Sequence, residues 1–208
     1  MKLISVFLLC ILLSIVFCKA LHAHSDGAPI ACLGSGDNRY SHRFYPPRST
    51  FTCGNLGCHY QYPIDCGSAK FKLFVVPKCE SGAIVDILIS FEKSSTGTHG
   101  FEITAQDRNE NRIVGDFIIG DAEDVQIIGA GLFVTHTKKG YTQKTWHIKW
   151  QAPPADFVVQ NPVRFYAMGV EGNNDDTAMG DYIYKATRLI EVTQKKEKKE
   201  QVHVHRKE

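Results

Sequence analysis

Hydrophobic and polar residues alternate along most of the chain beyond residue 70. In 145–150, for example, Trp146, Ile148 and Trp150 alternate with polar side chains. This period of two is typical of strands that bury one face. The segments that show it, or that are apolar runs of strand length, are 70–76, 85–92, 100–106, 113–119, 125–137, 145–150, 163–170 and 182–192. Asn, Asp, Gly and Pro turns bound them and no helical period competes, so about eight strands are expected.

The pattern predicts an all-β fold of the β-sandwich or barrel type, because strand follows strand with no helix between them. Within 125–137, the segment Gly129-Ala130-Gly131 is expected to form a bend or bulge. The expected core contains the apolar residues that share the period-two register: Phe71, Leu73, Ile87, Ile89, Phe101, Ile103, Trp146, Ile148, Trp150 and Phe165.

Residues 1–20 have the features of a secretory signal peptide. Lys2 supplies the positive charge, 3–17 is apolar, and Cys18-Lys19-Ala20 places small residues before a cut after Ala20. The apolar run is shorter than the ~20 residues of a membrane span. No other stretch approaches that length, so we expect a secreted, extracellular protein without stable membrane insertion.

The mature chain reads as one domain with two irregular ends. With 208 residues, 43% of them hydrophobic, the chain is long enough for a single core. Residues 21–68 are rich in turn-forming residues and are expected to form a cysteine-rich lead-in, packed on a strand domain at 69–193. Residues 194–208 are charged and of low complexity, so a disordered tail is expected there.

The charge distribution argues against nucleic-acid binding. The chain has 24 basic and 22 acidic residues, but Lys2 and Lys19 lie in the leader, and 195–208 holds six basic and three acidic residues. Residues 21–194 therefore keep 16 basic and 19 acidic residues, a net charge of −3. Nucleic-acid binding needs a clustered basic face, which such a body does not supply.

Five cysteines remain once the leader is removed, and they are Cys32, Cys53, Cys58, Cys66 and Cys79. In a secreted chain disulfides are the expected state. We expect at least two, which tie 21–68 to itself and to the first strands, with Cys79 as the end that lies in the body. Five is an odd number, so one thiol is free, pairs between chains or binds a ligand. The sequence fixes neither the pairing nor the oligomeric state.

The segment Cys53-Gly-Asn-Leu-Gly-Cys58-His59 has an alternative interpretation. Two cysteines followed by histidine resemble c-type haem attachment, but four residues separate the cysteines where that motif has two. Haem would take both thiols and His59 as an axial ligand, and zinc could add Cys66 to the same set. Disulfide chemistry is the favoured interpretation, so no cofactor is expected. A redox or haem-linked secreted protein is the alternative function.

The remaining polar residues form no enzyme signature. The sequence has no Gly-x-Ser-x-Gly elbow, phosphate loop or zinc-protease helix motif. His99, His136 and His147 lie in or beside predicted strands, with His147 on the polar face. The oxygen-rich segment 171–181 could suit calcium, but it lacks the ligand order of a calcium loop. A turn rich in Asn and Asp is expected there instead.

Several blocks together resemble reeler (reelin N-terminal-like) domains. Their order over residues 27–193, rather than any single block, carries the resemblance. The blocks are 27–29 followed by Cys32, 100–106, 114–117, 133–136, 150–153, 163–166 and 180–184. The Cys53 to His59 element and the Asn-Asp segment before Gly180 are closer to bacterial reeler-like domains of surface proteins.

The resemblance implies an immunoglobulin-like antiparallel sandwich and an extracellular role in matrix binding, cell adhesion or innate defence. We therefore expect a non-enzymatic module that binds an extracellular protein, a glycan or a microbial surface. The expected contact segment is Arg39-Tyr40-Ser41-His42-Arg43-Phe44-Tyr45, which mixes arginine with the aromatic residues enriched at binding hot spots. The alternative is that these aromatic residues cover the sandwich as packing.

Overall fold

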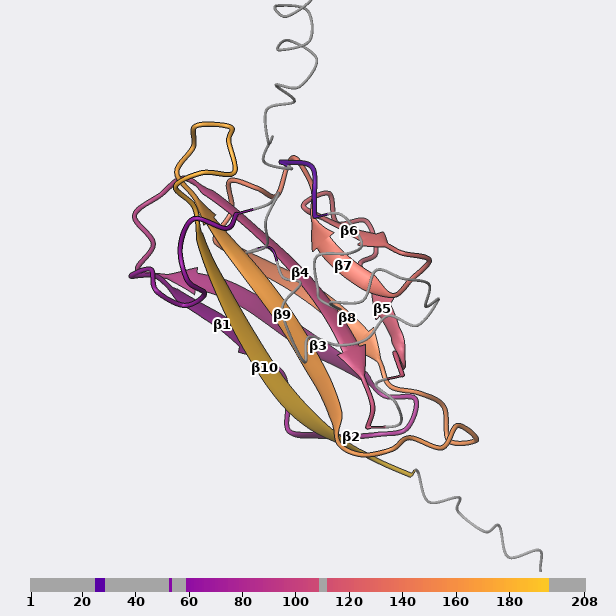
Figure 1. The fold of residues 1–208 in the computed structure, drawn as a ribbon. Helices are drawn as coiled ribbons and strands as arrows, with labels where there is room; N and C mark the ends of the chain where they lie inside the picture. Colours follow the sequence, from indigo (N-terminus) through magenta and orange to yellow (C-terminus); the bar gives the residue numbers. More distant parts are fainter. Residues whose placement is uncertain (1–24, 29–52, 54–58, 109–111, 195–208) are drawn as a thin grey trace, which may run out of the picture.

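The structure, a computed structural model, describes residues 25–28, 53, 59–108 and 112–194. They form two β-sheets packed face to face (Figure 1). The strands are β1 (Lys70–Phe74), β2 (Lys78–Glu80), β3 (Ile84–Glu92), β4 (Thr98–Gln106), β5 (Asp116–Ile118), β6 (Val125–Ile128), β7 (Phe133–His136), β8 (Thr145–Gln151), β9 (Val163–Gly172) and β10 (Tyr182–Thr193). The described part of the chain contains no helix long and apolar enough to cross a membrane.

One sheet has the strand order β1-β3-β8-β5 and the other β2-β10-β9-β4-β7-β6. Neighbouring strands run antiparallel except β2 and β10, which are parallel. The register places Ile87 opposite Ile148 in the first sheet and Phe101 opposite Gly169 in the second. The predicted all-β sandwich is thus confirmed, whereas its immunoglobulin-like character stays a prediction.

The core between the sheets contains the predicted residues. All ten are buried except Phe71, which is half-buried against the same cluster. Trp150 packs edge-on against Phe165, with ring centroids 5.1 Å apart, and its indole N–H donates to the carbonyl of Val114 at 3.1 Å. A large aromatic residue is therefore buried without an orphaned donor.

One predicted strand needs correction, and one strand was not predicted. Residues 125–137 are not one bent strand but a hairpin, because Gly129, Ala130 and Gly131 all have positive φ and cannot continue a strand. The N–H of Leu132 donates to the carbonyl of Gly129 at 3.3 Å and closes the turn. Strand β2 was not predicted, since three residues are too few for alternation to be read. The described residues contain ten strands, where about eight were expected.

Strand β4 is buried on both of its faces. Phe101 and Ile103 face the core between the sheets, while Glu102 and Thr104 alternate onto the outer face of the six-stranded sheet. A second apolar cluster lies on that outer face. It contains Cys53, Phe133, Met168 and Ile183, with Ala28 and Ile64 packed against it. Parts of the chain before β1 therefore pack on the sheet.

Candidate functional site

Connections from both sheets meet at one end of the sandwich, which we call the loop end. It consists of 59–69 before β1, 93–97 between β3 and β4, 137–144 between β7 and β8, and 173–181 between β9 and β10. Figure 1 shows the last of these as the orange loop that projects beyond the sheets. Binding residues concentrate on loops that a rigid scaffold holds in place.

Hydrogen bonds join these connections to one another. The Thr98 hydroxyl donates to the carbonyl of Gly172 at 3.0 Å, and the His99 N–H donates to the carbonyl of Tyr141 at 2.6 Å. The Lys144 ammonium donates to the carbonyl of Ser94 at 2.8 Å. The connection 137–144 is therefore bonded directly to 93–97 and to the start of β4.

A buried carboxylate, Glu171, lies beneath the loops at the end of β9. It is 2% exposed. The Tyr184 hydroxyl donates to its Oε2 at 2.7 Å, and the Ser94 hydroxyl donates to its Oε1 at 2.6 Å. Tyr184 also accepts a hydrogen bond from the N–H of Ala69 at 3.2 Å. Because both carboxylate oxygens have donors, the charge is held inside the protein without an unpaired atom.

The network fixes the proton positions of its serine and histidine. Nε2 of His99 lies 2.7 Å from the Ser94 hydroxyl oxygen. The single hydroxyl hydrogen of Ser94 already points at Glu171, so His99 donates rather than accepts. Burial, and then the nearby Lys144 ammonium, lower the pKa of His99 to about 4, which leaves its ring neutral at pH 7. Burial and then Glu171 raise the pKa of Tyr184 above its usual range.

This arrangement differs from an activated nucleophile. In such a site the histidine accepts the proton of the serine. Here the Ser94 hydroxyl donates a hydrogen bond to a carboxylate and accepts one from His99. The network therefore has the character of a support for the loops.

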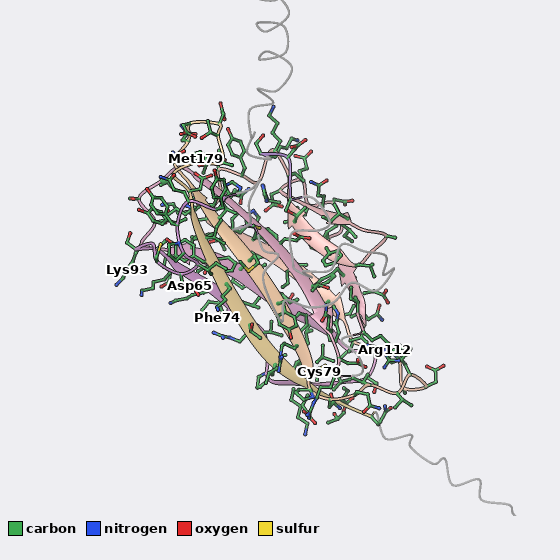
Figure 2. The ribbon with its side chains drawn as sticks, in the orientation of Figure 1. Asp65, Phe74, Cys79, Lys93, Arg112 and Met179 are labelled. Carbon is green, nitrogen blue, oxygen red and sulfur yellow. The ribbon has the colours of Figure 1, made fainter. Side chains whose placement is uncertain are left out.

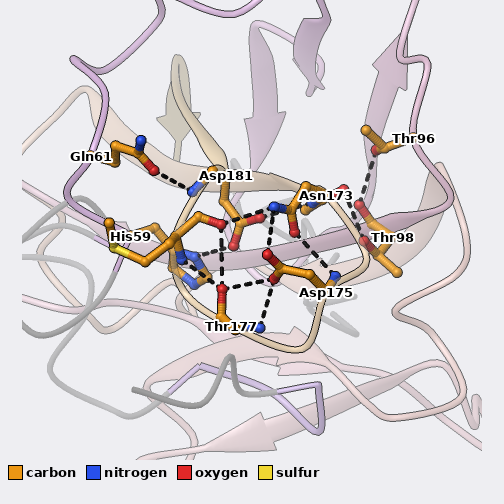
Figure 3. Close-up of polar contacts among 11 residues, drawn as sticks. His59, Gln61, Thr96, Thr98, Asn173, Asp175, Thr177 and Asp181 are labelled. Atoms are coloured by element: carbon orange, nitrogen blue, oxygen red, sulfur yellow. Dashed lines mark hydrogen bonds and ion pairs between the residues drawn. The ribbon is translucent and has the colours of Figure 1, made fainter. Parts of the chain in front are cut away.

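Asp181 joins the loop 173–181 to the segment before β1 (Figure 3). Its side chain is buried, Oδ1 accepts from the N–H of Asn173 at 2.8 Å, and Oδ2 lies 2.6 Å from Nδ1 of His59. A second tie runs from the N–H of Gly180 to the amide oxygen of Gln61 at 2.6 Å. The segment before β1 thus holds the C-terminal end of the loop at Gly180 and Asp181, and Asp181 in turn holds its N-terminal end at Asn173.

Side chains of the loop also hold it from within (Figure 3). The Asn173 amide donates to Oδ2 of Asp175 at 2.9 Å and to the carbonyl of Met179 at 3.0 Å. Oδ1 of Asp175 accepts from both the N–H and the hydroxyl of Thr177 at 2.8 Å. These bonds to Thr177 lower the pKa of Asp175. The loop is the hydrogen-bonded turn that its Asn and Asp content predicts.

Three side chains of the loop remain available at its surface. Asn174 and Asp176 are exposed and have positive φ, and Met179 is 40% exposed. Figure 2 shows Met179 at the loop end, at the upper left of the view. A fixed backbone therefore presents an apolar side chain beside polar and acidic ones.

Most of the predicted contact and cysteine residues lie outside the described part of the chain. This holds for Arg39, Tyr40, His42, Arg43, Tyr45, Cys32 and Cys58. Cys66 is exposed and Cys79 is half-buried, and both are free thiols in the structure. Burial raises the pKa of the Cys79 thiol. The predicted bridge to Cys79 is not seen among the described residues, and the disulfides stay a prediction.

His59 is engaged by Asp181, a partner that the sequence did not indicate. A carboxylate on one ring nitrogen is also common for histidines that bind metals. However, the described residues contain no group of three His, Cys, Asp or Glu side chains that could hold a metal ion. The haem or zinc interpretation gains no support from this geometry.

The residues that support the loop end could not be found from the sequence. Ser94, Tyr184 and Asp181 are 77 residues or more from a partner that they contact. No local spacing could have related them. One signal was available for Glu171 and Asp181, since they are the first and last residues of an oxygen-rich segment between two strands.

Comparisons with known proteins find similarity only among solved structures. No protein-family model matches the sequence, and no curated protein does. The structure is similar to the human F-spondin reeler domain (fragment 1), with 21% identity, a TM-score of 0.44, and coverage of 58% of this chain and 88% of that one. It is also similar to the Reelin-N domain of F-spondin, with 20% identity, a TM-score of 0.46, and coverage of 64% and 94%. Both solved structures are reeler domains, the family whose sequence blocks this chain resembles.

Proposed function

We propose that the chain is a secreted, non-enzymatic recognition module that binds an extracellular macromolecule through its loop end. The observation that carries the proposal is the fixed loop 173–181. It is held within by Asp175 and at its base by Asp181, yet it exposes Met179. A loop that is already ordered loses little conformational freedom on binding.

The character of the buried network also supports a binding role. Ser94 donates its hydrogen bond to Glu171 and accepts one from His99. This direction supports the loops, whereas an activated nucleophile would donate to the histidine. The signal-peptide pattern at 1–20 supports secretion. The partner is a matrix protein, a glycan or a microbial surface, and the segment 39–45 is proposed as a second contact region.

A solid-phase binding assay tests the proposal. The secreted protein is applied to immobilised laminin, to heparin, and to whole Gram-positive and Gram-negative bacteria. An Asp176→Ala/Met179→Ala variant removes two exposed side chains of the loop, and an Arg39→Ala/Tyr40→Ala/Arg43→Ala variant tests the second region. Asp156→Ala/Val158→Ala is the matched control, because both residues are exposed in the connection between β8 and β9 at the opposite end.

We expect the parent and the control to bind the same surface, and the loop variant to lose at least about tenfold in affinity. Equal binding by all folded variants would remove the loop end from consideration. Hydrolytic or redox turnover by the purified parent would overturn the non-enzymatic assignment itself.

A further inference from the structure

The outer face of the four-stranded sheet is exposed at its centre. Side chains alternate along each strand of this sheet, so one face lines the core and the other points away from it. The outward residues at the centre are Asp86 of β3 and Lys149 of β8, which lie opposite each other in the register. Their side chains are 84% and 55% exposed. This face therefore offers an accessible surface.

Apolar side chains lie on both sides of this centre. Phe74 of β1 is opposite Leu88 of β3, and Ile118 of β5 is opposite Lys149. Phe74 is 45% exposed, and Leu88 and Ile118 are half-buried. Apolar side chains that gather on an exposed surface with polar neighbours are typical of a protein-interaction site.

The charges of this face cancel. Among the outward side chains of the four strands, three are basic and three are acidic, and they are Lys70, Lys72, Lys149, Asp86, Glu92 and Asp116. Nζ of Lys149 lies 2.6 Å from Oδ1 of Asp86, and Nζ of Lys72 lies 2.6 Å from Oε1 of Glu92. Both signs therefore lie side by side. A surface of this kind can be complementary to a second copy of itself.

A two-fold axis that runs along the sheet between β3 and β8 uses this arrangement. It places Asp86 of one copy over Lys149 of the other, and the reverse contact follows by symmetry. It also brings Ile118 of one copy over β1 of the other, beside Phe74. Sheets that pack face to face cross at about 30°, and the contacts nearest the axis are kept at that angle.

We propose that two copies of this chain associate through the outer faces of their four-stranded sheets. The charges of Asp86 and Lys149 form a network of four across the axis, and the apolar side chains around them exclude water. Because the axis runs parallel to the strands, both loop ends point the same way. The inference goes beyond the proposed function, since a dimer with two free loop ends gains avidity for a partner that repeats its binding site.

Sedimentation velocity of the intact protein over a range of concentrations tests this association. We expect the parent to form a reversible dimer. In Asp86→Lys or in Lys149→Glu, charges of the same sign meet across the axis, and the dissociation constant should rise at least about tenfold. Both positions are exposed, so the variants should keep the fold, which circular dichroism checks.

A mixture of the two variants separates this interface from a general effect of charge. Asp86→Lys carries two basic groups at the centre and Lys149→Glu carries two acidic ones, so an equal mixture should form the dimer that neither variant forms alone. Lys185→Glu and Glu191→Lys are the matched controls. They make the same kinds of charge change at exposed positions on β10, in the other sheet, and should dimerise as the parent does.

Three results would overturn the proposal. The first is a parent that stays monomeric at every concentration. The second is a mixture of Asp86→Lys and Lys149→Glu that associates no more than the separate variants do. The third is an equal loss of dimer in the β10 controls. None of these measurements involves binding at the loop end, so the proposed function is tested separately.

Discussion

Nδ1 of His59 lies 2.6 Å from Oδ2 of Asp181, although the two residues are 122 positions apart in the sequence. The other carboxylate oxygen of Asp181 holds the N–H of Asn173. One buried side chain therefore sets the position of the loop 173–181 relative to the segment before β1. The shape of the loop end depends on this contact.

We expect Asp181→Ala to destabilise the fold by about 1–3 kcal/mol, because it leaves the N–H of Asn173 and the His59 ring without their acceptor. Urea unfolding measures the change, and limited proteolysis should cut within 173–180 sooner than in the parent. Asp176→Asn is the control, since Asp176 is exposed on the same loop and asparagine tolerates its positive φ. If both variants are equally stable, the supporting role of Asp181 is wrong.

His99 should make stability depend on pH. Its folded pKa is lowered to about 4 from an ordinary value of 6.5, mainly by burial. Between these two values the unfolded chain binds a proton that the folded chain does not, so stability falls as the pH falls from 6.5 to 4. Above 6.5 the ring is neutral in both states and the effect vanishes.

Urea unfolding at pH 7 and pH 5 measures this effect by comparing the parent with His99→Gln. The variant should show a smaller loss of stability between the two values. His147→Gln is the control, because His147 is exposed on β8, and it should behave as the parent does. Identical losses in the parent and His99→Gln would contradict the assignment.

Tyr184→Phe should lower the free energy of unfolding by about 1–3 kcal/mol. Oε2 of Glu171 and the N–H of Ala69 both lose the hydroxyl as their hydrogen-bond partner. The matched control is Tyr182→Phe on the same strand. Its ring stacks on Tyr62 at a centroid distance of 4.8 Å, and phenylalanine keeps that contact. Thermal unfolding compares the two. A loss in Tyr182→Phe as large as that in Tyr184→Phe would show that the network is not the cause.

Trp150→Ala should destabilise the domain by about 3–5 kcal/mol, because it empties a fully buried site between the sheets. Ile84→Ala is the control, since Ile84 is 56% exposed and its truncation should change stability by less than about 0.5 kcal/mol. Equilibrium unfolding in urea measures both. A Trp150→Ala protein as stable as the parent would contradict the core assignment.

The sequence predicted those strands in which the alternation runs over several residues and one face is apolar. Trp146, Ile148 and Trp150 identified β8 and its buried face, and both agree with the structure. The same alternation misled for β4, where Glu102 and Thr104 are as buried as their apolar neighbours. Alternation shows that two faces differ in polarity, but not that the polar face is exposed.

The candidate site could be predicted only in part. The oxygen-rich segment at 171–181 marked a turn correctly, because Asn and Asp bond to nearby backbone groups. Its supports could not be found, since His59 and Ser94 reach it only through the packing of distant strands. Contacts of this kind follow from topology, which local periodicity does not encode.

The hydrogen bonds of the buried Glu171 carboxylate show which side chains of the loop end support its structure and which do not. Its hydrogen bonds end on Ser94 and Tyr184, and none reaches the exposed tip of the loop at Asn174, Asp176 and Met179. Substitutions at these three positions that tolerate the positive φ of Asn174 and Asp176 should therefore leave the framework unchanged. For protein engineering, the tip is a natural place to graft foreign recognition sequences.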